Sequence, residues 1–473
     1  MLFPTVEYAL FFLVVLTVAW SLYRHPALHK IFLLSASYVF YGFWNWAYVP
    51  LLFGISLFSG LVALRIQKSV TAKQKKAWLI GGVVVCLSTL AYYKYTAFLL
   101  TTLLRIAGRS GPAQHISVYS PLLPLGISFF VFHAISLLGD CYRGKVKEEI
   151  DLGDALLYVA FFPQLIAGPI LRASRFLPQL AVPRNPRAIH VNRALLLIVS
   201  GLFKKVIVSN MLATRLVEPV FAVPQGFGGW DTLLAVYGYA AQIYCDFSGY
   251  TDIAIGCALL LGYRFPRNFN APYAATNPQD FWRRWHISLS SWLRDYLYFP
   301  LGGSRKGRGR SYINLMITML LGGLWHGAAW TFVAWGGLHG SYLVIHRLWT
   351  RIEWQPVQTL RRAGGWKWAS RILLFHAVCA GWIFFRAPSF SLAFSVFSRL
   401  AAPGVATLAS GPILLVLFFG LAGQFMPSRW RNGLEIEMGR WPALARGAAL
   451  AAAIAAIEIL GPSGVAPFIY FQF

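Results

Sequence analysis

The sequence predicts an all-α, polytopic integral membrane protein. Of its 473 residues, 57% are hydrophobic and only 12% are charged, which is about half the charged share of a soluble domain. Apolar runs of the length that crosses a bilayer, about 20 residues, recur along the whole chain. So few polar side chains cannot cover a water-soluble core, and lipid must therefore be the solvent for much of the exterior.

We expect about 11–12 transmembrane helices, because about twelve apolar runs approach the required length. The candidate spans are residues 5–23, 31–47, 49–66, 78–104, 121–139, 190–213, 232–262, 312–330, 331–348, 370–386, 411–427 and 445–460. The first run is expected to be retained, because Glu7 is the only charge between Met1 and Phe12 and a cleavable signal peptide begins with basic residues.

The basic residues predict an orientation. Lys and Arg number 42 against 16 Asp and Glu, and they lie in short loops between apolar runs. This is the positive-inside pattern and not a nucleic-acid footprint, so we expect no nucleic-acid partner. Five basic clusters fall on one side, which is predicted to be cytoplasmic, at residues 24–30, 65–76, 143–147, 305–310 and 347–371. Both termini and the loop 218–231 are then extracytoplasmic, and the exceptions to the rule are Arg105, Arg109 and Arg386.

The cysteines predict no disulfide, zinc site or cysteine nucleophile. They are five in number, form no CxxC pair and lie mostly in apolar runs.

Two segments differ from simple spans. Residues 152–170 are apolar but contain Pro163, Gly168 and Pro169, which break helices, so a re-entrant or bent segment is expected. Residues 280–298 predict one amphipathic helix at the membrane interface or in a protein-lined funnel. Its apolar stripe is Trp282, Trp285, His286, Leu289, Leu293 and Tyr296, and its polar stripe is Arg284, Ser288, Ser291 and Asp295.

His326 is the strongest candidate for chemistry. It lies within residues 311–346, which contain no Asp, Glu, Lys or Arg, and an ionisable side chain at such a place is a functional candidate. The alternative is a neutral core histidine held by one hydrogen bond. The flanking Gly323 and Gly327 favour function, because they let a ligand or backbone approach closely. A neutral imidazole in a medium of low dielectric constant suits a general base.

Two further histidines are weaker candidates. His286, on the apolar stripe, is either a site residue or a packing residue with a polar tip. His339, in a second glycine-flanked block, is expected to be a packing residue.

Asp246 and Asp252 are the only charged residues between Asp231 and Arg264, so they are expected to be buried or to line a cavity. They either orient a histidine or form an ion pair with Arg. Lys94 and the pair Lys204–Lys205 are expected to extend toward the headgroup layer.

The glycine-rich basic loop 302–310 contains Arg305, Lys306 and Arg308, which could bind the phosphates of an acyl donor. The alternative is a loop that only sets the topology. A Walker motif, a GxGxxG fingerprint and a GxSxG elbow are absent from the sequence.

At these residues the chain resembles the membrane-bound O-acyltransferase family, in its bacterial alginate O-acetyltransferase-like branch. The resemblance rests on ordered blocks at residues 161–169 (FFPQLIAGP), 201–205 (GLFKK), 246–252 (DFSGYTD), 280–286 (DFWRRWH), 324–327 (LWHG) and 468–473 (FIYFQF).

The resemblance implies a single domain over residues 1–473, built around a central tunnel. N-terminal helices would occupy residues 1–150, a catalytic core about 151–350 and C-terminal helices 351–473. His326 matches the catalytic histidine of the family and His286 its second histidine. Trp325, Asp246, Asp252 and Trp285 would line the tunnel or orient these groups.

The resemblance also implies a reaction and a location. The donor would be a cytosolic acyl thioester, acetyl-CoA, with no tightly bound cofactor and no metal. The chain would lie in a bacterial inner membrane and supply acetyl groups for O-acetylation of an exopolysaccharide such as alginate, together with a periplasmic acetyltransferase partner.

Two alternatives stay open at this point. The first is transfer of D-alanyl or another acyl group from a carrier protein to a cell-envelope polymer. The second is a transporter of a lipid-linked saccharide, in which the aspartates and histidines would line the path.

Overall fold

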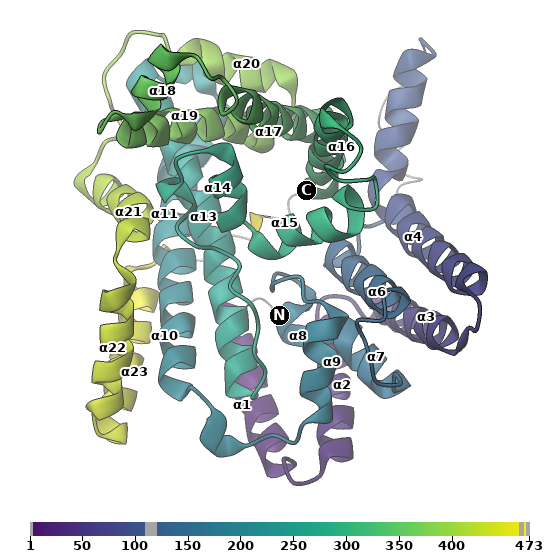
Figure 1. Cartoon of the computed structure of the whole chain (residues 1–473). Coiled ribbons are helices and arrows are strands. Elements are labelled where there is room, and N and C mark those ends of the chain that lie inside the picture. Colours follow the sequence, from purple (N-terminus) through teal and green to yellow (C-terminus); the bar gives the residue numbers. More distant parts are fainter. Residues whose placement is uncertain (1–2, 109–120, 463–467, 470–473) are drawn as a thin grey trace. The chain divides into compact units, whose positions relative to one another are not determined.

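The fold was examined in a computed structural model, which describes residues 3–108, 121–462 and 468–469 (Figure 1). These residues form helices, turns and loops, and no strand occurs among them. The predicted all-α class is therefore confirmed. Arg109, an exception to the charge rule, and residues 470–473 of the last motif lie outside the described ranges.

The described chain divides into two compact units, which are considered separately. The first contains residues 1–194 and 254–266, and the second contains residues 195–253 and 267–473. The predicted subdivision near residues 150 and 350 follows the sequence order and stays a prediction.

The first unit contains most of the N-terminal helices. They are α1 (Val6–Ser21), α2 (Pro26–Gly42), α3 (Val49–Lys68), α4 (Ala72–Ile106), α6 (Ile127–Tyr142), α7 (Leu152–Ala160), α8 (Phe162–Leu165) and α9 (Ala173–Ala181), with the 3₁₀ turns η1 (Trp46–Tyr48) and η2 (Pro186–Ala188).

The expected break in residues 152–170 is confirmed. Helix α7 ends at Ala160, Phe161 leaves the helical conformation, and α8 begins at Phe162 with Pro163 in its first turn. The stretch from Leu157 to Leu171 is buried throughout. Irregular backbone in a lipid environment must be covered by protein in this way, because lipid offers it no hydrogen bonds.

Helices α10 (Val191–Leu202) and α13 (Gly229–Leu260) each contribute residues to both units. The remaining helices belong to the second unit and include three π-helical stretches. They are η3 (Phe203–Ser209, π), α11 (Asn210–Leu212), η4 (Ala213–Val217, π), α12 (Glu218–Ala222), α14 (Pro278–Arg284), α15 (Ile287–Leu293), η7 (Arg294–Tyr298, π), α16 (Arg308–His326), α17 (Trp330–Trp349), α18 (Gln355–Arg362), α19 (Trp366–Arg386), α20 (Phe390–Arg399), α21 (Gly411–Ala422), α22 (Ser428–Arg440) and α23 (Ala443–Leu460), with the 3₁₀ turns η5 (Pro224–Gly226), η6 (Pro272–Ala274) and η8 (Gly423–Phe425).

Several helices are suited to cross a bilayer, which confirms a multi-pass membrane protein. Among the described residues, five helical segments are long and apolar enough: Trp46–Lys68, Ala72–Ile106, Val191–Ala222, Trp366–Arg386 and Ala443–Leu460. Shorter apolar helices are Val6–Ser21, Ile127–Tyr142 and Gly411–Phe425. Each lies over a span that the sequence predicts.

The prediction of a single amphipathic helix over residues 280–298 is wrong. Helix α14 ends at Arg284, and His286 takes a left-handed conformation with φ of 41° before α15 begins. Ser288, placed on the polar stripe, is buried and hydrogen-bonded to Asn268. The prediction failed because the apolar residues recur at helical spacing on both sides of the break at His286. The contact of Ser288 with Asn268, which is distant in sequence, gives no signal in this periodicity.

Helices α16 and α17 approach closely through glycines. A Cβ atom on Gly323 would lie 2.2 Å from the carbonyl oxygen of Phe332, and one on Gly336 would lie 2.4 Å from that of Met319. Small residues permit such backbone approach between helices in membranes. This contact fixes the end of α16, where His326 lies.

Replacing Gly336 with Ala is expected to lower the free energy of unfolding in detergent by about 1–3 kcal/mol, because the new methyl group meets backbone atoms that cannot move aside. The matched control is Gly337→Ala in the same helix. Its Cβ would lie 3.6 Å from a Leu320 methyl group, an ordinary contact. Equal stability of the two variants would contradict the close approach.

Candidate active site

His326 is the last residue of α16 and lies inside the second unit. Its side chain is 3% exposed, so it does not face lipid. The helix ends there because Gly327 is extended, and a Cβ atom on Gly327 would clash with the Phe332 ring at 2.1 Å. The His326 ring contacts the rings of Trp325 and Trp335, each at a centroid distance of 5.0 Å, and Phe385 at 5.3 Å. The rings of Trp325, Trp335 and Phe385 therefore form an aromatic shell around the His326 imidazole.

His286 lies beside it. Its ring is fully buried and its centroid is 6.5 Å from that of His326. The Phe247 ring of α13 packs edge-on against it at 4.5 Å, and the Trp325 ring lies 6.1 Å away. Two histidines that are 40 residues apart in sequence thus share one buried region with Trp325.

Asn268 determines the tautomer of His286. The Asn268 Oδ1 atom accepts from the Ser288 backbone N–H at 3.1 Å and from the Ser288 hydroxyl at 2.8 Å, which identifies it as the oxygen. His286 Nδ1 lies 3.2 Å from the same atom, so Nδ1 carries the proton and donates it. Nε2 then keeps its lone pair, and among the described residues it has no hydrogen-bond partner.

His286 is neutral. It lies between two short helices and outside the membrane-spanning ones, and burial lowers its pKa to about 3. A neutral ring with a free lone pair can accept a proton or a hydrogen bond.

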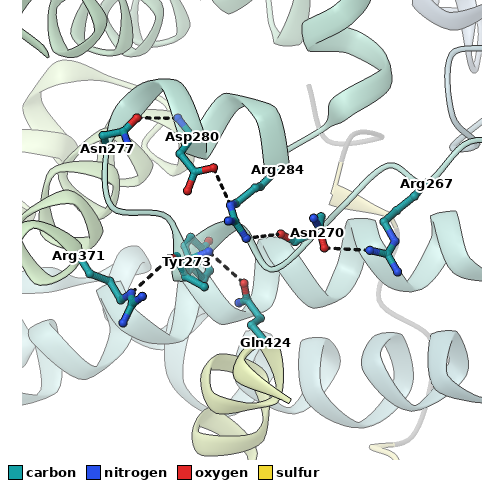
Figure 2. A network of polar contacts seen from close by, with 9 residues as sticks. Arg267, Asn270, Tyr273, Asn277, Asp280, Arg284, Arg371 and Gln424 are labelled. Atoms are coloured by element: carbon teal, nitrogen blue, oxygen red, sulfur yellow. Dashed lines mark hydrogen bonds and ion pairs between the residues drawn. The ribbon is translucent and has the colours of Figure 1, made fainter. Parts of the chain in front are cut away.

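A polar network holds the loop that supplies Asn268 (Figure 2). Arg284 forms an ion pair with Asp280 at 2.8 Å and donates to the Asn270 carbonyl. Arg267 donates to the Asn270 side chain at 2.9 Å. Farther along the loop, the Tyr273 N–H donates to Gln424 in η8, and Arg371 of α19 donates to the Ala274 carbonyl. The loop that supports His286 is thus connected to α19 and η8, which follow it in the sequence by about 100–150 residues.

Asp246 lies one residue before Phe247 and forms a buried ion pair with Lys205. The two side chains are 2% and 1% exposed. The other carboxylate oxygen of Asp246 accepts from the Ile469 backbone N–H at 2.9 Å. Phe468 packs against Phe247 at 5.6 Å and Tyr250 at 4.5 Å. The described part of the 468–473 block therefore docks on the face of α13 that supports His286.

The expectations for the charged residues need correction in part. Asp246 and Asp252 pair with Lys205 and Lys204, and not with Arg. Lys205 is buried and does not extend toward the headgroups. The two lysines follow each other in η3, and π-helical winding places both against α13. In the first unit, Lys94 donates to the Ser128 hydroxyl at 3.3 Å.

Trp285 is buried beside the histidine pair. Its ring packs on Phe281 at 5.7 Å and on Trp382 at 4.9 Å. His339 is also buried, 4.8 Å from the Trp335 ring and 5.2 Å from that of Trp282. Trp335 therefore separates His339 from His326, an arrangement that fits a packing role for His339.

Arg305 and Lys306 lie on an exposed loop, and Arg308 is the exposed first residue of α16. The loop is anchored by Asn314, which donates to the Gly303 carbonyl at 3.0 Å. In the described part of the chain, no contact joins these three side chains to the histidine pair, and their binding of donor phosphates stays a prediction. Within the same ranges, no group of three or more His, Cys, Asp or Glu could hold a metal ion.

Sequence reasoning missed several residues of the site. Asn268, Phe247, Trp335 and Phe385 contact the histidines, and no spacing in the sequence indicates this. Lys205 could have been found. An isolated cation and an isolated anion in two apolar runs must be neutralised together, because a buried charge without a partner is costly.

The left-handed conformation of His286 predicts an inverted ranking of two variants. His286→Gly is expected to be more stable than His286→Ala by about 1 kcal/mol, because glycine adopts positive φ without strain. The control is the same pair at Ser291 within α15, where glycine should be the less stable by about 1 kcal/mol. Denaturant unfolding in detergent measures both. If the Ala variant were the more stable one at both positions, the backbone of His286 would not be strained.

Removing one partner of the buried ion pair is expected to be costly. Asp246→Asn should lower the free energy of unfolding by about 3–5 kcal/mol, because it leaves Lys205 charged and buried. Glu437→Gln breaks an exposed pair with Arg440 and should cost about 1 kcal/mol or less. A small effect for Asp246→Asn would mean that the Lys205 ammonium is hydrated or neutral.

Comparison with known proteins agrees with these features. Residues 144–383, which contain both histidines, match the membrane-bound O-acyltransferase (MBOAT) family. The chain is 41% identical over 392 residues to a probable alginate O-acetylase of Azotobacter vinelandii, with 82% of this chain and 76% of the relative covered. It is 37% identical to the probable alginate O-acetylase of Pseudomonas putida over 94% of both chains. A peptidoglycan O-acetyltransferase of Helicobacter pylori is 37% identical over 80% of this chain and 74% of the relative.

The family match covers half of the chain, and the similarity to these relatives extends over most of it. These relatives are named as acetyl-transferring proteins, which favours an enzyme over the alternative of a transporter. The chain belongs to the membrane-bound O-acyltransferase family and is an acyltransferase.

Proposed function

We propose that this protein transfers an acetyl group from cytosolic acetyl-CoA toward a hydroxyl group of an exopolysaccharide such as alginate, with His326 as general base. It would act in a bacterial inner membrane together with a periplasmic acetyltransferase partner. The support comes from the acetyl-transferring relatives and from the pair of buried histidines, one of them at the end of α16.

The main support for this proposal is the proximity of His326 and His286, whose ring centroids lie 6.5 Å apart inside the aromatic shell. Acyl transfer from a thioester needs few groups, because the thioester is already activated. A base must take the proton of the acceptor hydroxyl, and donors must hold the reacting atoms in line.

The acceptor oxygen attacks the thioester carbonyl, and its proton passes to the imidazole of His326. The C–O ester bond forms, the C–S bond breaks, and the thiolate of CoA leaves with the proton that the imidazole returns. His286, held by Asn268 as the Nδ1–H tautomer, would receive a hydrogen bond from the acceptor at Nε2.

The aromatic shell supports the reaction in a second way. Trp325, Trp335 and Phe385 surround the His326 ring and exclude bulk water. Exclusion of water limits hydrolysis of the thioester and strengthens electrostatic interactions at the reacting atoms. On the donor side, the exposed side chains of Arg305, Lys306 and Arg308, in the loop before α16 and at its first residue, would bind the phosphates of CoA.

D-alanyl is the other acyl group that a specific observation supports. A teichoic acid D-alanyltransferase of Bacillus subtilis is 30% identical over 59% of this chain and 73% of the relative. The alginate O-acetylases match more of the chain at higher identity, which favours acetyl. Mass analysis of the modified polymer separates the two groups.

His326→Ala is expected to lower acetyl transfer by about 10²–10⁴-fold, the usual contribution of a general base, with unchanged protein levels in the membrane. The measurement is acetyl transfer from labelled acetyl-CoA, with polymer acetylation in cells beside it. The control is His346→Ala, at the opposite end of α17 from the aromatic shell. Wild-type transfer by the His326 variant would refute the assignment, whatever its stability.

A further inference from the structure

Within residues 3–108, 121–462 and 468–469, Arg386 has no counterion. It is the last residue of α19 and half-buried. Among the described residues it forms no ion pair, and no hydrogen bond to its guanidinium occurs. Asp246, a buried acid of α13, already pairs with Lys205 and accepts from the Ile469 N–H. The Arg386 charge is therefore open to a ligand.

A buried polar atom lies in the same neighbourhood. The Arg386 guanidinium lies over the Phe221 ring of α12, 5.8 Å from its centroid, and the Tyr239 ring of α13 lies 6.0 Å from the same ring. Tyr239 is fully buried, and its hydroxyl has no hydrogen-bond partner in the described part of the chain. Leaving a buried hydroxyl unpaired costs about 1–3 kcal/mol, so an occupant that pairs with it is expected.

Arg386 follows directly after a residue that contacts His326. The preceding residue, Phe385, packs on the His326 ring at 5.3 Å. The residues that follow, 388–390, are exposed. Arg386 thus lies between Phe385, which contacts the proposed general base, and residues 388–390, which are exposed. Under the predicted orientation, Arg386 lies on the extracytoplasmic side, where the charge rule disfavours arginine.

Helix electrostatics do not account for all of these features. A cation at a helix C-terminus balances the helix dipole, but this effect is screened by solvent and worth little at the surface. It also leaves the Tyr239 hydroxyl unexplained.

We propose that Arg386 and Tyr239 form an acceptor subsite that binds the carboxylate of an acidic saccharide. The inference rests on the proposed function, since it places the acceptor beside His326. A guanidinium supplies two parallel N–H donors that match the two oxygens of a carboxylate, and a hydroxyl adds a third donor. A phosphate, with three or four oxygens and a larger charge, would call for more donors than one arginine and one tyrosine.

The test measures binding by ligand-induced stabilisation of the purified full-length protein. Uronic-acid oligosaccharides should raise the melting temperature of the wild type in a concentration-dependent way, and neutral oligosaccharides of the same length should not. Arg386→Gln should weaken the apparent affinity roughly tenfold or more, Arg386→Lys less, and Tyr239→Phe by a smaller factor. Arg215→Gln removes an exposed arginine of η4 and is the control with unchanged affinity.

Three outcomes overturn the inference. They are no stabilisation of the wild type by oligouronates, equal affinity of the Arg386 variants and the wild type, and tighter binding of an acidic peptide than of the saccharide. Consumption of labelled acetyl-CoA by the wild type is measured in parallel. A wild type that consumes no acetyl-CoA counts against the proposed function alone. One that consumes it but is not stabilised by oligouronates counts against this subsite alone.

Discussion

The second unit depends on the rule that polar groups removed from water must find partners within the protein. Asp246 and Lys205 obey it most clearly, because each is almost fully buried and each neutralises the other. Their pairing ties η3 to α13, and the free carboxylate oxygen also fixes Ile469. Phe247, the neighbour of Asp246, packs on His286. The Asp246–Lys205 ion pair thus helps to position Phe247, the residue of α13 that contacts His286.

Glycine supplies the second constraint. Between α16 and α17, Gly323 and Gly336 bring backbone to backbone, and Gly327 makes room for the Phe332 ring at the point where α16 ends. A side chain at any of these positions would push the helices apart and move His326. The aromatic rings then fill the space around the imidazole, so close packing helps to fix its position.

The surroundings of the two histidines differ. His286 is held by Asn268 in a single tautomer and sits in a strained backbone conformation, a combination typical of functional sites. His326 is held by rings at a helix end. Such a division fits one residue that orients an acceptor and one that moves a proton.

The sequence by itself determined the membrane class, the approximate spans and the break near Pro163, because these follow from hydrophobicity and from helix-breaking residues. It also singled out His326 and His286 as candidates, because polar residues are rare in apolar runs. Only the tertiary structure decided that residues 280–298 break at His286, that Asp246 pairs with Lys205, and that Asn268, Trp335 and Phe385 surround the histidines. These features arise from contacts between segments that are distant in sequence, and periodicity along one helix carries no information about which face meets which partner.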